Sequence, residues 1–236
     1  MKYLCTSLAA ILLVVMVFSG TGAVNAAESD FSTETLSENE ENIIRSNAEI
    51  VPLGSPPRKL AIRCFDVNTD GMIVVGTSNG ETKTIAVYDA NGIYQYGFLY
   101  RVSGDFGVQW DGKNILIYSV RGDIAFCVNP DGEIEEIREI KNTTENNAYW
   151  HHVVFARERT VGDSRYKLKN NMGMLNFFTS SYSQLVCIHS DGSEQVIYDV
   201  NTEQLIKMVI IILCVILFAA ITLLTVYKQF RKMNQV

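Results

Sequence analysis

The sequence predicts an all-β domain, built of stacked antiparallel four-stranded units and followed by one C-terminal transmembrane helix. Three observations support this fold class. Between residues 58 and 200, short runs of β-branched and aromatic residues alternate with Asp-Gly and Asn-Gly pairs. The same succession of runs and turns recurs about every 40 residues. A run of nineteen uncharged residues, 208–226, follows the last turn.

The first 26 residues have the features of a signal peptide. Lys2 provides an early positive charge, an apolar stretch runs from Leu8 to Phe18, and Val24 and Ala26 occupy the −3 and −1 positions of a cleavage site. We therefore expect cleavage after Ala26. The alternative is an uncleaved N-terminal anchor, which the shortness of the apolar stretch disfavours.

Residues 27–57 are expected to form an acidic, disordered leader. Six acidic residues lie between residues 28 and 41, separated by Ser, Thr and Asn. Such a composition buries too little apolar surface to offset the entropy lost on folding. A docking tail is the functional alternative. Pro52, Pro56 and Pro57 then stiffen the chain before the folded domain, which we expect to begin at residue 58.

Asp-Gly and Asn-Gly pairs divide the segment 58–200 into predicted strands. Each pair offers the positive φ angles that tight hairpin turns require. The pairs end at Gly71, Gly80, Gly92, Gly112, Gly132 and Gly192. We therefore expect antiparallel hairpins throughout this segment.

Three of these turns belong to an internal repeat, in which a strand, a turn ending in glycine and a second strand follow one another. The first strands cover residues 84–88, 123–128 and 184–188, and the second strands cover residues 93–98, 133–140 and 194–200. Upstream, another glycine precedes a further strand in each copy: Gly71 before Ile73, Gly112 before Ile115, and Gly173 before Met174. A unit of four strands in about 40 residues is typical of propeller blades.

The first strand of each copy is apolar on both faces, which fits a sheet sandwiched between neighbours better than one with a face in water. Over residues 60–200 the chain thus resembles the degenerate β-propeller repeats of bacterial surface proteins. Three units leave open sheet edges. The alternatives are an irregular fourth unit from residues 48–57 and 145–160, completion by self-association, and a curved sandwich that never closes.

A possible calcium loop lies at Asp66, Asn68 and Asp70, followed by Gly71. Alternate carboxylate and amide oxygens can point at one hard cation, while the glycine allows the sharp turn. The acidic residue that would complete an EF-hand loop is replaced by Thr77. A polar β-turn without an ion is the competing interpretation and the one we favour. No other cofactor is expected.

A possible binding loop lies in the longest stretch without strand signals, residues 141–172. Trp150, His151 and His152 are followed there by Asp163 and Arg165. Adjacent histidines on an extended chain point to opposite sides, so the pair does not chelate one metal by itself. Exposed or loop-packing residues are the simpler interpretation.

Cys64, Cys127 and Cys187 are expected to be free thiols in the core. Cys127 and Cys187 occupy the same repeat position, which separates their Cα atoms by more than the roughly 7 Å that a disulfide allows. Buried free cysteines behave as small hydrophobic residues.

The run 208–226 predicts a transmembrane helix, since nineteen residues at 1.5 Å each reach roughly 28 Å. Residues 201–207 are expected to be a short connector and residues 227–236 a cytoplasmic tail. That tail holds Lys228, Arg231 and Lys232 and no acidic residue, so it is expected inside and the β domain outside.

Net charge excludes one class of partner for the β domain. Twenty basic residues, less Lys2 and the three of the tail, leave 16 against 26 acidic residues, a net charge of −10 for residues 27–207. Nucleic acid is therefore not an expected partner. The expected partners are the membrane, through the C-terminal helix, and a protein or a second copy that completes the sheet edges.

Two functions remain open at this level. The first is a non-enzymatic binding or sensing domain, perched on the membrane as an accessory or interaction subunit. The second is a cell-surface hydrolase or lyase with carboxylates on the loops of a propeller scaffold. Convergence of two or three acidic side chains in one pocket would favour the enzyme; the candidates are Asp66, Asp70, Asp105, Asp111 and Asp163.

Overall fold

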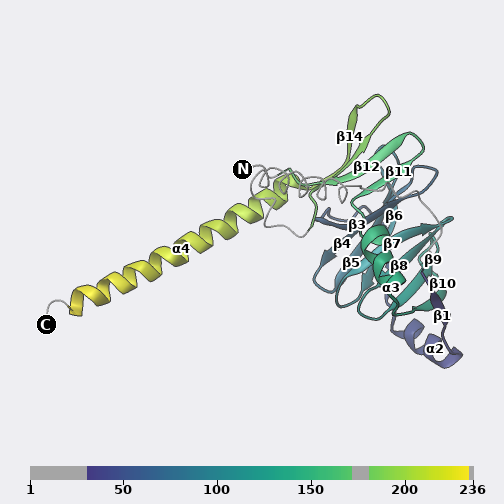
Figure 1. Cartoon of the computed structure of the whole chain (residues 1–236), viewed down its shortest axis with the longest axis horizontal. Helices are drawn as coiled ribbons and strands as arrows, with labels where there is room; N and C mark the ends of the chain where they lie inside the picture. The colour runs from purple at the N-terminus through teal and green to yellow at the C-terminus, as the bar shows by residue number, and fades with distance from the viewer. Residues whose placement is uncertain (1–30, 172–180, 234–236) are drawn as a thin grey trace, which may run out of the picture.

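The computed structural model describes residues 31–171 and 181–233. They form three antiparallel sheets and a long C-terminal helix that projects away from them (Figure 1). The predicted signal peptide lies outside the described residues. Within the described part of the chain the three sheets do not close into a propeller or a barrel.

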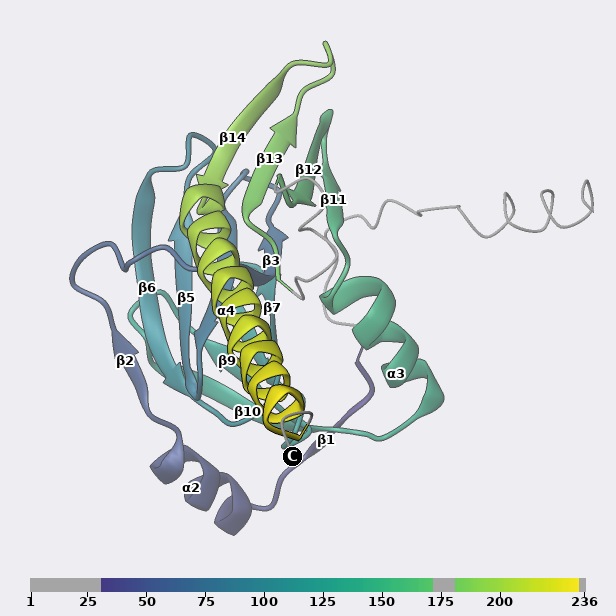
Figure 2. The ribbon, with the colours of Figure 1, turned by 90° about the vertical axis from the view of Figure 1, so that its left-hand side faces the viewer.

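Four consecutive strands form the first sheet: β3 (Ile62–Val67), β4 (Ile73–Asn79), β5 (Thr82–Tyr88) and β6 (Tyr94–Arg101). A short strand, β2 (Ile50–Pro52), pairs with the free side of β6 (Figure 2). The inner edge of this sheet is therefore β3 and its outer edge is β2.

The second sheet repeats this plan with β7 (Phe106–Asp111), β8 (Asn114–Ser119), β9 (Ile124–Val128) and β10 (Ile134–Ile140). Here β1 (Thr33–Thr35) pairs with the free side of β10. The third sheet contains β11 (Glu158–Val161), β12 (Ser164–Lys169), β13 (Gln184–Ile188) and β14 (Glu194–Asp199). Its order is β11-β12-β13-β14, with no added strand among the described residues.

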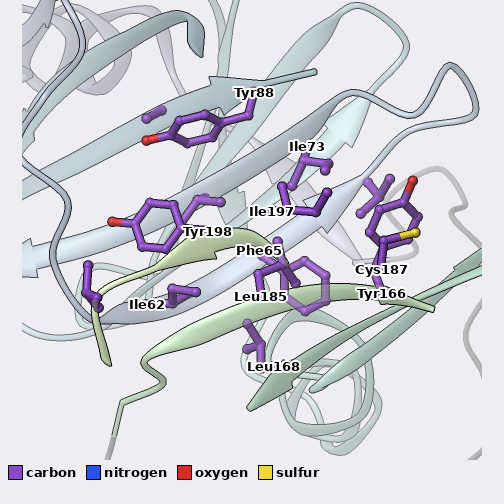
Figure 3. Close-up of a cluster of buried hydrophobic side chains, with 14 residues drawn as sticks. Ile62, Phe65, Ile73, Tyr88, Tyr166, Leu168, Leu185, Cys187, Ile197 and Tyr198 are labelled. Carbon is purple, nitrogen blue, oxygen red and sulfur yellow. The ribbon is translucent and has the colours of Figure 1, made fainter. Parts of the chain in front are cut away.

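The first sheet is the middle layer of the domain. One of its faces packs on the third sheet through residues such as Phe65, Ile73, Leu185 and Tyr198 (Figure 3). Its other face packs on the second sheet, where Val74 and Ile85 meet residues of β7 and β8. The apolar character of both faces of the predicted strand at 84–88 is explained by this double burial.

A helical segment covers the remaining face of the second sheet. It consists of α3 (Thr144–Tyr149), capped by the Thr143 side chain, and a π-helical turn, η1 (Trp150–Val154). Trp150 and Val154 pack there with Phe31 and Tyr118. Gly107 of β7 makes room for them, because a Cβ at this position would lie 2.2 Å from Val154 Cγ1. The alternative of a fourth β unit from residues 145–160 is wrong for the helical part of that segment.

The predicted disordered leader is also wrong from residue 31 onward. β1, α2 (Glu38–Asn47) and β2 form a strap along the outer edges of the second and first sheets. α2 begins with a capping box, in which Ser37 and Glu40 bond each other's backbone N–H groups. Arg45 of α2 donates to the backbone oxygen of Ile134 at 2.5 Å, which fastens the helix to β10. Edge pairing and capping thus order a segment whose composition alone predicts disorder.

The third unit differs in register from the prediction. The strand that pairs with β13 is β12, at residues 164–169, and the glycine of the preceding hairpin is Gly162, with φ 54°. The predicted strand beginning at Met174 lies outside the described residues. Fourteen residues, 170–183, separate β12 from β13, whereas two separate β4 from β5 and four separate β8 from β9.

One turn recurs between the third and fourth strands of all three units. Gly92, Gly132 and Gly192 have φ between 78° and 88°, and each donates its N–H to the backbone oxygen three residues earlier. In the first unit the Asp89 carboxylate also accepts hydrogen bonds from the N–H groups of Asn91 and Ile93 at 2.9 Å. The Asp-Gly and Asn-Gly pairs are therefore parts of hairpin turns, as the sequence predicts.

One residue, Val200, separates the end of β14 from the C-terminal helix, α4 (Asn201–Met233). The predicted connector 201–207 is thus wrong, because these residues form the first turns of the helix. Residues Asn201–Thr225 form a helix long and apolar enough to cross a membrane. Thr222 and Thr225 donate their hydroxyls to backbone oxygens one turn earlier, which satisfies these polar groups inside the helix.

Candidate functional site

Asp66 lies in the core, where it holds a buried arginine. Its side chain sits on β3 at 3% exposure, and Arg159 of β11 is 1% exposed. Asp66 Oδ1 accepts from Arg159 Nε at 2.8 Å, and Asp66 Oδ2 accepts from the backbone N–H of Trp110 at 2.9 Å. The carboxylate thus connects the inner strands of the first, second and third sheets.

The Arg159 guanidinium has further acceptors at the end of the helical segment. Its NH2 group donates to the backbone oxygen of Val153 at 2.7 Å, and its NH1 group donates to those of Ala156 and Glu158 at 3.3 and 3.1 Å. A cation here also compensates the partial negative charge at the helix C-terminus. Because both charges are buried and fully engaged, we assign the pair to structure and not to substrate contact.

The calcium-loop prediction is replaced by a turn. Asp66 is committed to Arg159, while the Asn68 side-chain oxygen accepts from the N–H groups of Asp70 and Met72 at 3.0 and 2.8 Å. Two of the three predicted ligands are therefore engaged within the fold. In the described ranges no group of three or more His, Cys, Asp or Glu side chains that could hold a metal is found.

The residues of the predicted binding loop lie in three places, on η1, in the β11–β12 turn and on β12. Trp150 is buried against Phe31 and Tyr118, whereas His151 and His152 are exposed on η1. Asp163 lies in the β11–β12 turn, and Arg165 is exposed on β12, where it pairs with Thr160. The stretch without strand signals contains α3, η1, β11 and β12, which separate the five residues over different elements.

The acidic residues considered for an enzyme are also spread apart. Asp66 is buried, Asp70 lies in the β3–β4 turn, and Asp105 pairs with Arg63 at the surface. Asp111 borders a pocket of about 220 Å³ on the outer face of the second sheet, together with Glu136 and Arg138. Arg138 is bonded to Glu136 at 2.6 Å, which neutralises one of the two carboxylates. Asp111 and Glu136 thus border one pocket in the described part of the chain, with one of the two carboxylates held in an ion pair.

The three cysteines predicted to be free are confirmed as free and buried. Burial raises the pKa of the Cys64 thiol to about 12. Such a thiol is a poor nucleophile near neutral pH, because the thiolate is the reactive form. Cys64 therefore serves packing, beside Gly76, whose missing side chain leaves room for its sulfur.

The outer edge strands of the three sheets differ in whether a further strand pairs with them, which the sequence does not reveal. β2 pairs with Phe98, Leu99 and Tyr100 of β6, and β1 pairs with residues 138–140 of β10. In both sheets these positions lie six to eight residues after the turn glycine, Gly92 or Gly132. The equivalent positions after Gly192 are residues 198–200, which are the last two residues of β14 and Val200. β14 is an edge strand with no pairing partner on its outer side among the described residues.

A shallow groove of about 460 Å³ lies on the outer face of the third sheet, next to this edge. Val196 of β14 is 51% exposed there, and Lys169 bonds Glu194 across the face at 2.6 Å. Apolar surface, paired charges and a free strand edge are thus adjacent. We call β14 together with this groove the open edge; the lining side chains used below are Lys169, Val186, Glu194 and Val196.

Comparison with known proteins gives no family for this chain. No protein-family model matches it, and no curated protein matches it. The residues and their geometry therefore carry the functional argument alone.

Proposed function

We propose that this protein is a single-pass membrane protein whose propeller-like, extracytoplasmic β domain binds a protein partner at the open edge. The observation that carries the proposal is the difference between three equivalent edges. Two are covered by β1 and β2 at matching positions, whereas β14 has no added strand in the ranges that the structure describes. A strand edge with unpaired backbone groups is a ready template for an added strand.

Two terminal segments support the proposed location. α4 is long and apolar enough to cross a membrane, and its last part holds Lys228, Arg231 and Lys232. The positive-inside rule favours a cytoplasmic tail and an extracytoplasmic β domain, in agreement with the predicted signal peptide. The domain then stands directly on the membrane surface, because no linker separates β14 from α4.

A binding role has more support than the alternative of a hydrolase or lyase. That alternative requires free carboxylates that share a pocket. Asp111 and Glu136 border one pocket, but Glu136 is paired with Arg138, and Asp66, Asp70 and Asp105 lie in three other environments. In contrast, β14 combines an outer side that no described strand pairs with and an exposed valine, Val196. Edge pairing by a partner strand uses main-chain hydrogen bonds for affinity and side-chain contacts on alternate positions for specificity.

Photo-crosslinking of the full chain in native membranes tests this proposal. A photoreactive phenylalanine is placed at Val196 and, as a control of similar exposure, at Ile43 of α2, which is 55% exposed. We expect a covalent adduct from position 196 and none from position 43. Adducts to a second, differently tagged copy identify self-association as the form of partnership. Recovery of the uncrosslinked chain alone from both variants rejects the proposal.

A further inference from the structure

We infer that the β domain and α4 move as one rigid body, so that a tilt or rotation of the domain is passed directly to the membrane-spanning helix. This goes beyond partner binding, because it describes how an event outside the membrane reaches the other side. The rigidity of the junction does not depend on the proposed function. The idea that a bound partner causes the tilt or rotation does rest on the proposed function.

The backbone at the junction is hydrogen-bonded on both sides of a single residue, Val200. Its N–H donates to the backbone oxygen of Ser183 at 2.8 Å, which extends the β13–β14 pairing. Its oxygen accepts from the N–H of Gln204 at 3.0 Å, which is the first bond of the helix. Sheet and helix therefore share this residue, and Val200 is buried in the core that joins the first and third sheets.

Side chains fasten the first turn of α4 to the domain. Ser183, which is fully buried, bonds the Asn201 side-chain oxygen through its hydroxyl at 3.1 Å. Asn201 is also held by its N–H, which donates to the Asp199 carboxylate at 2.7 Å. Arg58 reaches Glu203 at 3.0 Å from the segment before β3. The exposed Arg58 pair contributes little, so the buried Ser183 contact and the shared backbone dominate.

Because of this junction, α4 is a stiff helix that is continuous with the β domain and long enough to extend across the bilayer. α4 has 33 residues, which at 1.5 Å each is about 50 Å of continuous helix. Figure 1 shows it leaving the sheets without a break. Since β14 is both the open edge and the strand that continues into this helix, a partner strand paired with β14 would lie immediately beside the junction.

Distances between pairs of spin labels on the full chain in lipid nanodiscs test the rigidity. Cys5 and Cys214 are replaced by alanine, and the buried Cys64, Cys127 and Cys187 are retained, because burial protects them from labelling. One label pair joins Lys113→Cys in the β7–β8 turn to Leu223→Cys in α4. A reference pair joins Lys113→Cys to Glu81→Cys, both within the β domain.

We expect the domain–helix pair to give one distance distribution, as narrow as that of the reference pair. Insertion of Gly-Ser-Gly between Val200 and Asn201 should broaden it severalfold, whereas the same insertion between Gly54 and Ser55, in an exposed loop, should not. Asn201→Ala, which removes the Ser183 contact, should broaden it to a smaller extent. A domain–helix distribution much broader than the reference in the unmodified junction overturns the inference. That result would leave the crosslinking test of the docking role unaffected.

Discussion

Asp66 and Arg159 form a buried ion pair, 2.8 Å from oxygen to nitrogen, at the point where the inner strands of the three sheets meet. The two residues come from different sheets, and the second carboxylate oxygen of Asp66 receives the Trp110 N–H of the remaining one. A charge pair of this kind is costly to break on one side only, because the other charge stays buried without compensation.

Asp66→Ala is therefore expected to lower the free energy of unfolding by about 3–5 kcal/mol. Unfolding of the full chain in detergent micelles, followed by the fluorescence of Trp110 and Trp150, measures this change. Asp105→Ala is the matched control, since it breaks the exposed pair with Arg63 and should cost less than about 1 kcal/mol. Equal losses from the two variants would show that the buried pair has no special role.

Gly107→Ala is expected to destabilise the fold by about 1–3 kcal/mol through overpacking. The new Cβ would lie 2.2 Å from Val154 Cγ1, and Val154 is fully buried. The double variant with Val154→Ala should lose less stability than the sum of the two single variants, because the clash is then removed. Gly54→Ala, with no atom near its Cβ, is the control and should be neutral. If the loss of stability in the double variant equals the sum of the two single losses, contact with Val154 is not the cause of the Gly107→Ala destabilisation.

Stability should fall as the pH rises from about 9 towards 12. Burial raises the pKa of the Cys64 thiol to about 12, from an ordinary value of 9.0, and the pKa of Tyr88 and Tyr100 to about 12, from 10.0. Above the ordinary values the unfolded chain releases protons that the folded chain retains, so unfolding becomes more favourable with pH. Urea unfolding midpoints at pH 8 and 10.5 measure the slope.

Tyr88→Phe provides the control for that dependence. It removes one group that titrates in the unfolded chain, and it should make the fall in stability between pH 8 and 10.5 shallower. A slope that is unchanged, or stability that rises with pH, would contradict the assignment of the effect to buried acidic groups.

Millimolar calcium should leave the melting temperature of the full chain unchanged. Asp66 is bonded to Arg159, and the Asn68 side chain holds the turn that contains Asp70, so the predicted loop does not present three free ligands. Thermal melts with calcium and with a chelator measure this directly. A calcium-dependent rise that disappears in Asn68→Ala would reinstate the ion site.

The strands and turns of the first two units can be predicted from the sequence because each turn has a local residue pattern. Gly71, Gly92 and Gly132 follow Asp or Asn and adopt φ of 77°, 78° and 88° in the structure. The third unit is out of register because its first hairpin turns at Val161-Gly162, without an acidic or amide residue before the glycine. Gly173 lies at a spacing close to that in the other units. The sequence comparison therefore takes Gly173 as the turn glycine of the third unit.

The ordered strap and the central ion pair required information of different kinds. The S-x-x-E pattern of Ser37 and Glu40 marks the start of a helix in the sequence. A prediction based on the acidic composition of the segment gives disorder instead. Asp66 and Arg159 are 93 residues apart and have no local pattern in common. Their pairing follows from sheet stacking, which the sequence of one chain does not encode in any short window. The open edge is visible for the same reason only in the folded chain.

The shared turn of the three hairpins has a consequence for descent. Gly92, Gly132 and Gly192 hold the same backbone bonds while the residues around them differ, so this turn is retained while the sequence of the unit changes. In homologous chains, the spacing between turn glycines should therefore be kept better than the core residues. A search for distant homologues should compare those spacings, together with a single apolar helix placed directly after the last strand.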